Sequence, residues 1–202
     1  MFWNQVKSIT LAGDNQRAVA GGSDGRVYVF DMHSGCLVRT ISTSHNAEVT
    51  GVKVTSSDDF LITAGSMDSL VNVWQLNTHE LHSTMEGHGG SVTCVAISPN
   101  GIFAISGSED HTARVWGLTL GMVVSVFKVL VGHTDQVTCV AVAITNKSIV
   151  VSGSRDANLI VWDMETGEDL HLLQGHLGYV TCVKIAGDGS IAVSGVYCRS
   201  NN

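Results

Sequence analysis

The sequence predicts an all-β protein built from repeated four-stranded sheets, and three observations point to that fold class. Histidines recur at steps of 43, 45 and 43 residues: His45, His88, His133 and His176. Aromatic residues recur at steps of 44, 42 and 46 residues: Phe30, Trp74, Trp116 and Trp162. The segments between them, such as Val92–Ile97, are short and β-branched, and turn-forming pairs such as Asn100–Gly101 separate them. A period in the low forties that starts with Gly-His and ends with Trp-Asp is typical of a β-propeller blade.

Each repeat reads as four antiparallel strands joined by hairpins. We place the repeats at about 1–43, 44–86, 87–131 and 132–174, with a partial fifth at 175–195 and a divergent tail at 196–202. The partial repeat begins with Gly175–His176 and loses the pattern after Gly195, so that Cys198 stands where a turn Asp is expected. A propeller ring consists of about four to eight complete blades. Because this chain has four repeats and only part of a fifth, we expect a ring that this chain does not close. The expectation is therefore a fragment or an alternatively ended isoform of a larger propeller protein.

The third repeat is longer than its neighbours. About three additional residues lie between Trp116 and Gly132, around Lys128. A bulge on an outer strand is the favoured interpretation, and a splice-site variant is the alternative.

The repeats resemble those of the WD40-repeat family over almost the whole chain, from about Val6 to Gly195. The best-preserved repeat reads GHTDQVTCVAV and then VVSGSRDANLIVWD, between Gly132 and Asp163. The repeat sequences are also similar to the WD-repeat region of NACHT and WD repeat domain-containing proteins. The resemblance implies a β-propeller that acts as a platform for other proteins.

The resemblance further implies that a buried, hydrogen-bonded line of four side chains stabilises each blade. Such a line suits a buried carboxylate, which is costly unless imidazole, hydroxyl or indole groups donate to it or to its partners. Two repeats carry the full set: His88, Ser106, Asp110, Trp116, and His133, Ser152, Asp156, Trp162. The second repeat has His45, Asp68 and Trp74, but Ala64 stands at the expected hydroxyl position, so we expect a weaker blade. The first repeat keeps Asp24 beside Phe2, Ala20 and Phe30, so we expect backbone amides of its own turn to bind Asp24.

The composition of the chain argues against some classes of binding partner. The chain has 44% apolar and 14% charged residues, and its net charge is −7 with 11 Lys and Arg. This balance argues against binding to nucleic acid or to an anionic membrane surface. The start of the chain lacks the pattern of a secretory signal, and the apolar stretch Met122–Val131 is too short for a membrane span. We expect a cytoplasmic protein, with a nuclear location as the alternative.

Three of the five cysteines occupy one repeat position: Cys94, Cys139 and Cys182. Their spacing is that of whole repeats, and no Cys-x-x-Cys pair exists, so we expect reduced, buried core residues. Neither a metal nor a cofactor is expected.

Enzyme motifs are only superficially present. Gly21–Gly25 reads Gly-x-Ser-x-Gly, but a nucleophile elbow needs a strand-to-helix turn and a propeller offers a strand-to-strand turn. The segment His79–His82 is one residue too short for His-Glu-x-x-His, and no phosphate-binding loop occurs. We therefore expect a protein that is not an enzyme.

In the WD40-repeat family, partners often touch the residue before the turn Asp and the residues just after the Gly-His pair. Transferred to this sequence, the candidate partner-binding residues are Met67, Glu109 and Arg155, together with Glu48, Asp135, Gln136 and Tyr179. The expected function is a protein-protein interaction scaffold. The alternatives are a sensing or autoinhibitory portion of a NACHT-type ATPase and a truncated isoform without stable independent function. We also expect the apolar end faces of an open stack to bind missing blades of the same protein or a second copy.

Overall fold

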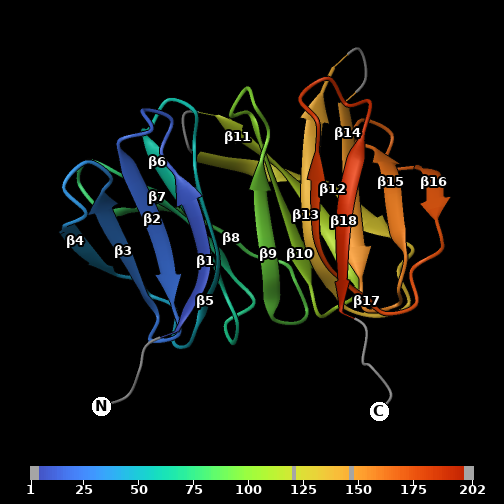
Figure 1. Ribbon diagram of the computed structural model, residues 1–202, viewed down its shortest axis with the longest axis horizontal. Helices are drawn as coiled ribbons and strands as arrows, with labels where there is room; N and C mark the ends of the chain where they lie inside the picture. Colours follow the sequence, from blue (N-terminus) through green and yellow to red (C-terminus); the bar gives the residue numbers. More distant parts are fainter. Residues whose placement is uncertain (1–4, 120–121, 146–147, 198–202) are drawn as a thin grey trace.

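A computed structural model describes residues 5–119, 122–145 and 148–197 (Figure 1). These residues form eighteen β-strands and no helix, which confirms the all-β prediction. The strands make four antiparallel sheets of four strands and one of two strands. Within each sheet, neighbours in sequence are neighbours in space, as expected when short turns join β-branched segments.

The sheets, here called blades one to five, follow one another along the chain. Blade one contains β1 (Val6–Leu11), β2 (Arg17–Gly22), β3 (Arg26–Asp31) and β4 (Leu37–Ser42). Blade two contains β5 (Val49–Val54), β6 (Phe60–Gly65), β7 (Val71–Gln75) and β8 (Leu81–Met85). Blade three contains β9 (Val92–Ile97), β10 (Phe103–Ser108), β11 (Thr112–Thr119) and β12 (Met122–Val131). Blade four contains β13 (Val137–Ile144), β14 (Ser148–Ser154), β15 (Leu159–Asp163) and β16 (Asp169–Leu173), and blade five contains β17 (Tyr179–Ile185) and β18 (Ala192–Tyr197).

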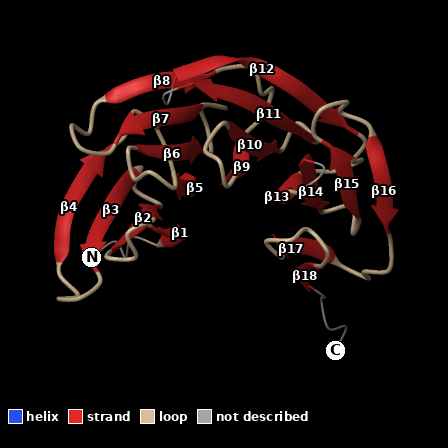
Figure 2. Ribbon diagram, turned by 90° about the horizontal axis from the view of Figure 1, so that it is seen from above, coloured by secondary structure: helices blue, strands red, loops and turns tan. Residues whose placement is uncertain are grey.

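The blades stand side by side in an open arc. Figure 2 shows the first strand of each blade on the inside of the arc and the fourth strand on the outside. Blade one and blade five stand at the two ends of the arc, and the described residues do not close a ring (Figure 2). The open propeller predicted from the repeat count is therefore confirmed.

The core lies between the blades. Each cluster of buried apolar side chains combines residues of two neighbouring blades, as when Val27 and Ile41 of blade one pack with Leu61 and Trp74 of blade two. The next three clusters join blades two and three, three and four, and four and five in the same way. Blades two to four are thus covered on both faces by their neighbours, which explains the high apolar content of the chain.

The additional residues of the third repeat lengthen the outer hairpin of blade three. Opposite β11, the pairing of β12 shifts once between Val115 and Trp116 and again between Gly117 and Leu118. The first shift occurs at the equivalent place in the other three four-stranded blades, so only the second shift is particular to blade three. The expected bulge on the outer strand is therefore present, but it lies between Ser125 and Val123 of β12 and not around Lys128. Phe127 packs against Phe103, with ring centroids 5.2 Å apart.

Candidate functional site

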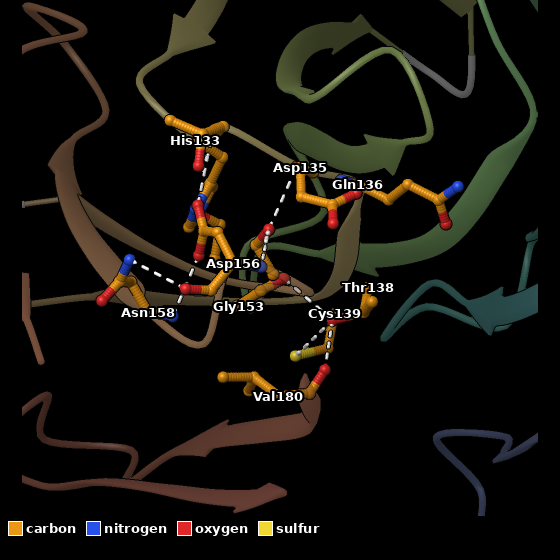
Figure 3. Close-up of polar contacts among 12 residues, drawn as sticks. His133, Asp135, Gln136, Thr138, Cys139, Gly153, Asp156, Asn158 and Val180 are labelled. Carbon is orange, nitrogen blue, oxygen red and sulfur yellow. Dashed lines mark hydrogen bonds and ion pairs between the residues drawn. The ribbon is translucent and has the colours of Figure 1, made fainter. Parts of the chain in front are cut away.

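The four-residue lines of blades three and four are continuous chains of hydrogen bonds. In blade three, His88 Nδ1 lies 2.8 Å from Asp110 Oδ2, His88 Nε2 lies 2.7 Å from Ser106 Oγ, and Trp116 Nε1 donates to Ser106 Oγ over 2.8 Å. In blade four, the three equivalent distances between His133, Asp156, Ser152 and Trp162 are each 2.8 Å. Figure 3 shows His133 and Asp156 facing each other. In this arrangement the carboxylate accepts from Nδ1, Nε2 accepts from the serine hydroxyl, and the indole donates to the same serine oxygen.

The charges of these lines are fixed by their partners. Burial alone would raise the pKa of Asp110, but hydrogen bonds from Thr112, His88 and the Gly89 amide outweigh it and hold that pKa below its ordinary value. Burial also opposes ionisation of Asp156, and the hydrogen bond from His133 with two backbone amides lowers its pKa. Burial lowers the pKa of His88 more than Asp110 raises it. Each line therefore holds an ionised carboxylate, and in blade three the imidazole beside it is neutral.

Blade two has a complete line, and the expectation that Ala64 leaves it without a hydroxyl is wrong. Thr63 Oγ1 lies 2.8 Å from His45 Nε2 and accepts from Trp74 Nε1 over 2.9 Å, while His45 Nδ1 lies 2.5 Å from Asp68 Oδ2. In blades three and four the hydroxyl residue lies four residues before the turn Asp, and the same count from Asp68 gives Ala64. The turn of blade two is one residue longer, so its hydroxyl residue is Thr63. The Gly65 amide reaches the Leu70 carbonyl, five residues on, whereas the equivalent Ser154 amide reaches Asn158, four residues on.

The first and last blades keep only part of the line. Asp24 accepts from the Arg26 amide of its own turn, as expected, and also from the Tyr28 hydroxyl over 2.6 Å. Tyr28 was not foreseen, although a phenol four residues after a turn Asp is a signal that a sequence can supply. In blade five, His176 Nε2 lies 2.8 Å from Ser194 Oγ. Phe2 and Cys198 lie outside the described residues.

The seven candidate partner-binding residues lie along one rim of the arc. Met67, Glu109 and Arg155 stand in the turns between second and third strands, and the other four stand before or at the start of first strands: Glu48, Asp135, Gln136 and Tyr179. Backbone hydrogen bonds join these two kinds of loop within a blade, from Ser66 to Glu48 over 3.1 Å and from Arg155 to Gln136 over 3.0 Å.

Several of these seven residues already have partners within the chain. Glu109 accepts from the Ser91 hydroxyl over 2.8 Å, Glu48 pairs with Lys7 at 3.1 Å, and Asp135 accepts from the Gln136 amide over 2.7 Å. Met67, by contrast, is 80% exposed. Arg155 lies over the ring of Tyr179, 5.8 Å from its centroid.

A cleft of about 710 Å³ opens beside this arginine and tyrosine at the end of the arc. Its lining combines one cation with apolar and aromatic side chains and a few threonines: Thr138, Arg155, Leu177, Gly178, Tyr179, Val180, Thr181 and Tyr197. Sequence reasoning missed Leu177 and Tyr197. Leu177 is 96% exposed and directly follows the Gly-His pair of the last repeat, so its position was available as a signal.

The repeated cysteines do not share one environment. Cys139 is buried and Cys94 partly buried, and burial raises their pKa values to about 12 and about 11 respectively. Both are therefore protonated, weakly reactive thiols at neutral pH. Cys182 is exposed, so its expected burial is wrong. Cys182 occupies the same place in blade five, but no described blade follows blade five to cover it.

The motifs that resemble enzyme sites lie in structural surroundings. Gly21–Gly25 spans the end of β2 and the turn to β3, so it is a strand-to-strand turn. Before β8, His79 Nδ1 lies 2.7 Å from Nη1 of Arg39, and within β8 the ring of His82 packs against that of Phe60. The part of the chain that the structure describes contains neither a group of three or more potential metal ligands nor a helix able to cross a membrane.

Comparison with known proteins agrees with this architecture. The family model described as "WD domain, G-beta repeat" matches four segments: 35–75, 79–117, 124–163 and 167–202. The chain is 26% identical over 181 residues to the guanine nucleotide-binding protein subunit beta-like protein of Encephalitozoon cuniculi, covering 85% of this chain and 54% of that protein. It is 30% identical over 190 residues to the angio-associated migratory cell protein of Homo sapiens, with 92% and 42% covered. It is 28% identical over 184 residues to autophagy-related protein 16 of Arabidopsis thaliana, with 91% and 35% covered.

The chain thus spans about half, or less, of the length of these three relatives. Each matched segment begins near the fourth strand of one blade and continues through the first strands of the next, so the repeats interlock neighbouring blades. With four matched repeats, the sheets they form and the His-Ser/Thr-Asp-Trp lines inside those sheets, the chain belongs to the WD40-repeat family.

Proposed function

We propose that this chain is a non-catalytic scaffold that docks proteins or peptides on the rim formed by the loops before the first strands and the turns between second and third strands. Stacked sheets with buried hydrogen-bonded lines hold this rim rigidly, and loops on a rigid frame are where binding specificity resides. The protein-interaction role follows from membership of the WD40-repeat family. The choice of rim and residues is our proposal.

One observation carries the proposal. Arg155, Leu177, Tyr179 and Tyr197 surround one open cleft, and three of them are exposed apolar or aromatic side chains. Tyrosine and arginine are enriched among residues that dominate binding energy. The partner that fits is a peptide segment with an apolar side chain for the cleft and an acidic side chain for the Arg155 guanidinium.

The proposal is tested by panning a phage-displayed random peptide library on the full chain and measuring the affinity of the selected peptides. The double variant Arg155→Ala, Tyr179→Ala should weaken binding at least about tenfold, since each truncation at such a position removes on the order of 1 kcal/mol or more. Met32→Ala is the control, because Met32 is exposed in the turn after β3, at the opposite end of the strands. Peptides that bind the double variant as well as the wild type would rule out this rim.

We also propose that the protein is cytoplasmic and that the exposed end faces of the arc take part in binding. A fluorescent fusion in living cells tests the location, and secretion of the fusion would contradict it. The similarity to NACHT-type ATPases remains a prediction, since none of the three relatives named above is described as one.

A further inference from the structure

One valine per blade forms the centre of every junction between blades. It stands at the start of the first strand, paired with the last residues of the second strand just before a β-bulge. In blades two to five this side chain is completely buried: Val49, Val92, Val137 and Val180, each 0% exposed. The equivalent residue of blade one is Val6, which is 65% exposed. Blade one therefore presents an apolar side chain that every other blade buries.

At three of the four junctions the preceding blade receives this valine in a socket beside a glycine, whereas in blade two Ala64 holds the equivalent position and packs with Val92. A Cβ atom added to Gly153 would lie 2.6 Å from Cγ1 of Val180 and 2.8 Å from Sγ of Cys139, so only glycine leaves room there. Gly107 has the same relation to Val137 and Cys94, at 2.6 and 2.7 Å. Figure 3 shows Gly153, Cys139 and Val180 gathered at this point.

At the junctions that follow blades two, three and four, a threonine adds a hydrogen bond between blades, whereas blade one has Lys7 at that position. The hydroxyl of Thr138 donates to the carbonyl oxygen of Val180 over 2.5 Å, and that of Thr93 to the carbonyl oxygen of Val137 over 2.5 Å. Thr50 makes the same bond to Val92 over 2.6 Å. The acceptor is thus always the carbonyl of the valine that fills the socket.

Blade five carries the receiving half of this junction with nothing described in it. The position of a Cβ on Gly195 lies 2.8 Å from Cys182 Sγ, but no valine approaches it among the described residues. The Thr181 hydroxyl reaches the Gly195 carbonyl of its own blade over 3.2 Å, and no described carbonyl of a following blade accepts from it. Blade five has two described strands, the first and the second, and these are the strands on which the first strand of a following blade mainly packs in the other junctions.

We propose that the chain binds a second copy of itself head to tail through these two halves. Val6 of one copy fills the socket at Gly195 and Cys182 of the other, and the Thr181 hydroxyl donates to the Val6 carbonyl oxygen. Ile9 and Leu11, both exposed on β1, extend the apolar contact. The two surfaces differ, so a dimer still has an unoccupied blade-one surface at one end and an unoccupied blade-five surface at the other. Association therefore continues beyond the dimer unless a ring closes.

Sedimentation equilibrium of the full chain tests the proposal. The weight-average mass should rise with concentration above the 21.4 kDa of one chain. Val6→Asp should lower the association constant at least about tenfold by placing a charge in the apolar socket. Val38→Asp is the matched control: Val38 is 60% exposed, but it lies on the outer strand β4, away from the end face. Equal effects of the two variants, or a wild type that stays at the mass of one chain, would overturn the proposal.

Cross-linking provides a second measurement that does not depend on the fold of the Asp variant. In a background with Cys36 and Cys198 replaced by Ser, Val6→Cys places a thiol beside Cys182 of a second copy, and oxidation should produce a disulfide-linked ladder on a non-reducing gel. The ladder should disappear when Cys182→Ser is added. Met67→Cys, an exposed site on the rim, should not produce it. A Val6→Cys ladder no stronger than that of Met67→Cys would contradict the head-to-tail contact, while peptide binding at the rim is scored independently of either result.

Discussion

At the scale of single residues, a blade depends on the hydroxyl that joins His to Trp. The Thr63 hydroxyl of blade two is fully buried and serves both His45 Nε2 and Trp74 Nε1. Removing it leaves two buried polar atoms without this partner, although the volume of the side chain need not change.

Thr63→Val should therefore destabilise the protein by about 1–3 kcal/mol, measured as a shift in the urea unfolding curve. Thr78→Val is the control, because the Thr78 hydroxyl makes only exposed contacts near the turn before β8. Indistinguishable unfolding curves for the two variants would show that the blade-two line does not contribute to stability.

The sequence allowed the His, Asp and Trp of each line to be recognised, because each is distinctive within its repeat. The hydroxyl was misplaced in blade two, since Ser and Thr are common and the added residue in the turn shifts the count from Thr63 to Ala64. Leu177 follows a Gly-His pair and could have been included with the other residues at that position. Tyr197 could not, because the cleft that it lines lies where blade four meets blade five, and a single repeat does not indicate which residues of two blades lie close together.

The residues of the lines also determine how stability responds to acid. The pKa of His88 lies below its ordinary value of 6.5, and those of Asp110 and Asp156 lie below 3.8. A group with a lowered pKa in the folded state binds fewer protons than in the unfolded chain, so its stabilising contribution is complete above the ordinary pKa and is lost as the pH falls.

We therefore expect the urea midpoint to decrease once the pH falls below 6.5, through His88, and more steeply below 3.8, through the two carboxylates. Asp110→Asn should reduce the steeper, more acidic part of this decrease. A midpoint that rises between pH 6.5 and 3.8 would contradict the assignment of a neutral His88.

At the scale of elements, a glycine on the second strand of blades one, three and four sets how closely the next blade approaches, while Ala64 stands at this position in blade two. Gly153 of β14 faces Val180 and Cys139 at distances that leave no room for a methyl group. Gly195 of β18 faces only its own exposed Cys182 at short range among the described residues, and that side chain is able to turn away.

Gly153→Ala should thus destabilise the protein by about 1–3 kcal/mol through overpacking, whereas Gly195→Ala should change its stability by much less. Thermal unfolding of dilute samples compares the two, since dilution keeps self-association from stabilising the wild type. If Gly153→Ala lowered the stability no more than Gly195→Ala, the side chains of Val180 and Cys139 would be able to move and make room for the added methyl group.

The open arc itself followed from counting repeats, whereas the complementarity of its ends did not. Counting shows that the repeat pattern is lost after Gly195, but nothing in the sequence distinguishes Val6 from any other valine in a strand. Only the contrast between its exposure and the burial of Val49, Val92, Val137 and Val180 identifies it as half of a junction.

At the scale of the whole molecule, a stack in which each blade touches only its neighbours behaves as a one-dimensional chain of junctions. The stability of any blade is then the sum of its own sheet and one or two contacts. Among the described residues, blade five has two strands and a single junction, through Val180, so it should unfold before the others. Blade three has a junction on either side, through Val92 and Val137.

This arrangement predicts different consequences for the same substitution at two junctions. Val180→Ala and Val137→Ala each remove two buried methyl groups, a loss on the order of 2 kcal/mol. Hydrogen exchange should show β17 and β18 opening in the first variant while β5 to β11 stay as protected as in the wild type. In the second variant, protection should fall on both sides of the break, in β9 to β11 and in β13 to β15, because neither half then has its full set of neighbours. Uniform loss of protection along the chain in both variants would show instead that the arc unfolds as one cooperative unit, since a chain of independent junctions has no means of transmitting the loss at Val180 to blade two.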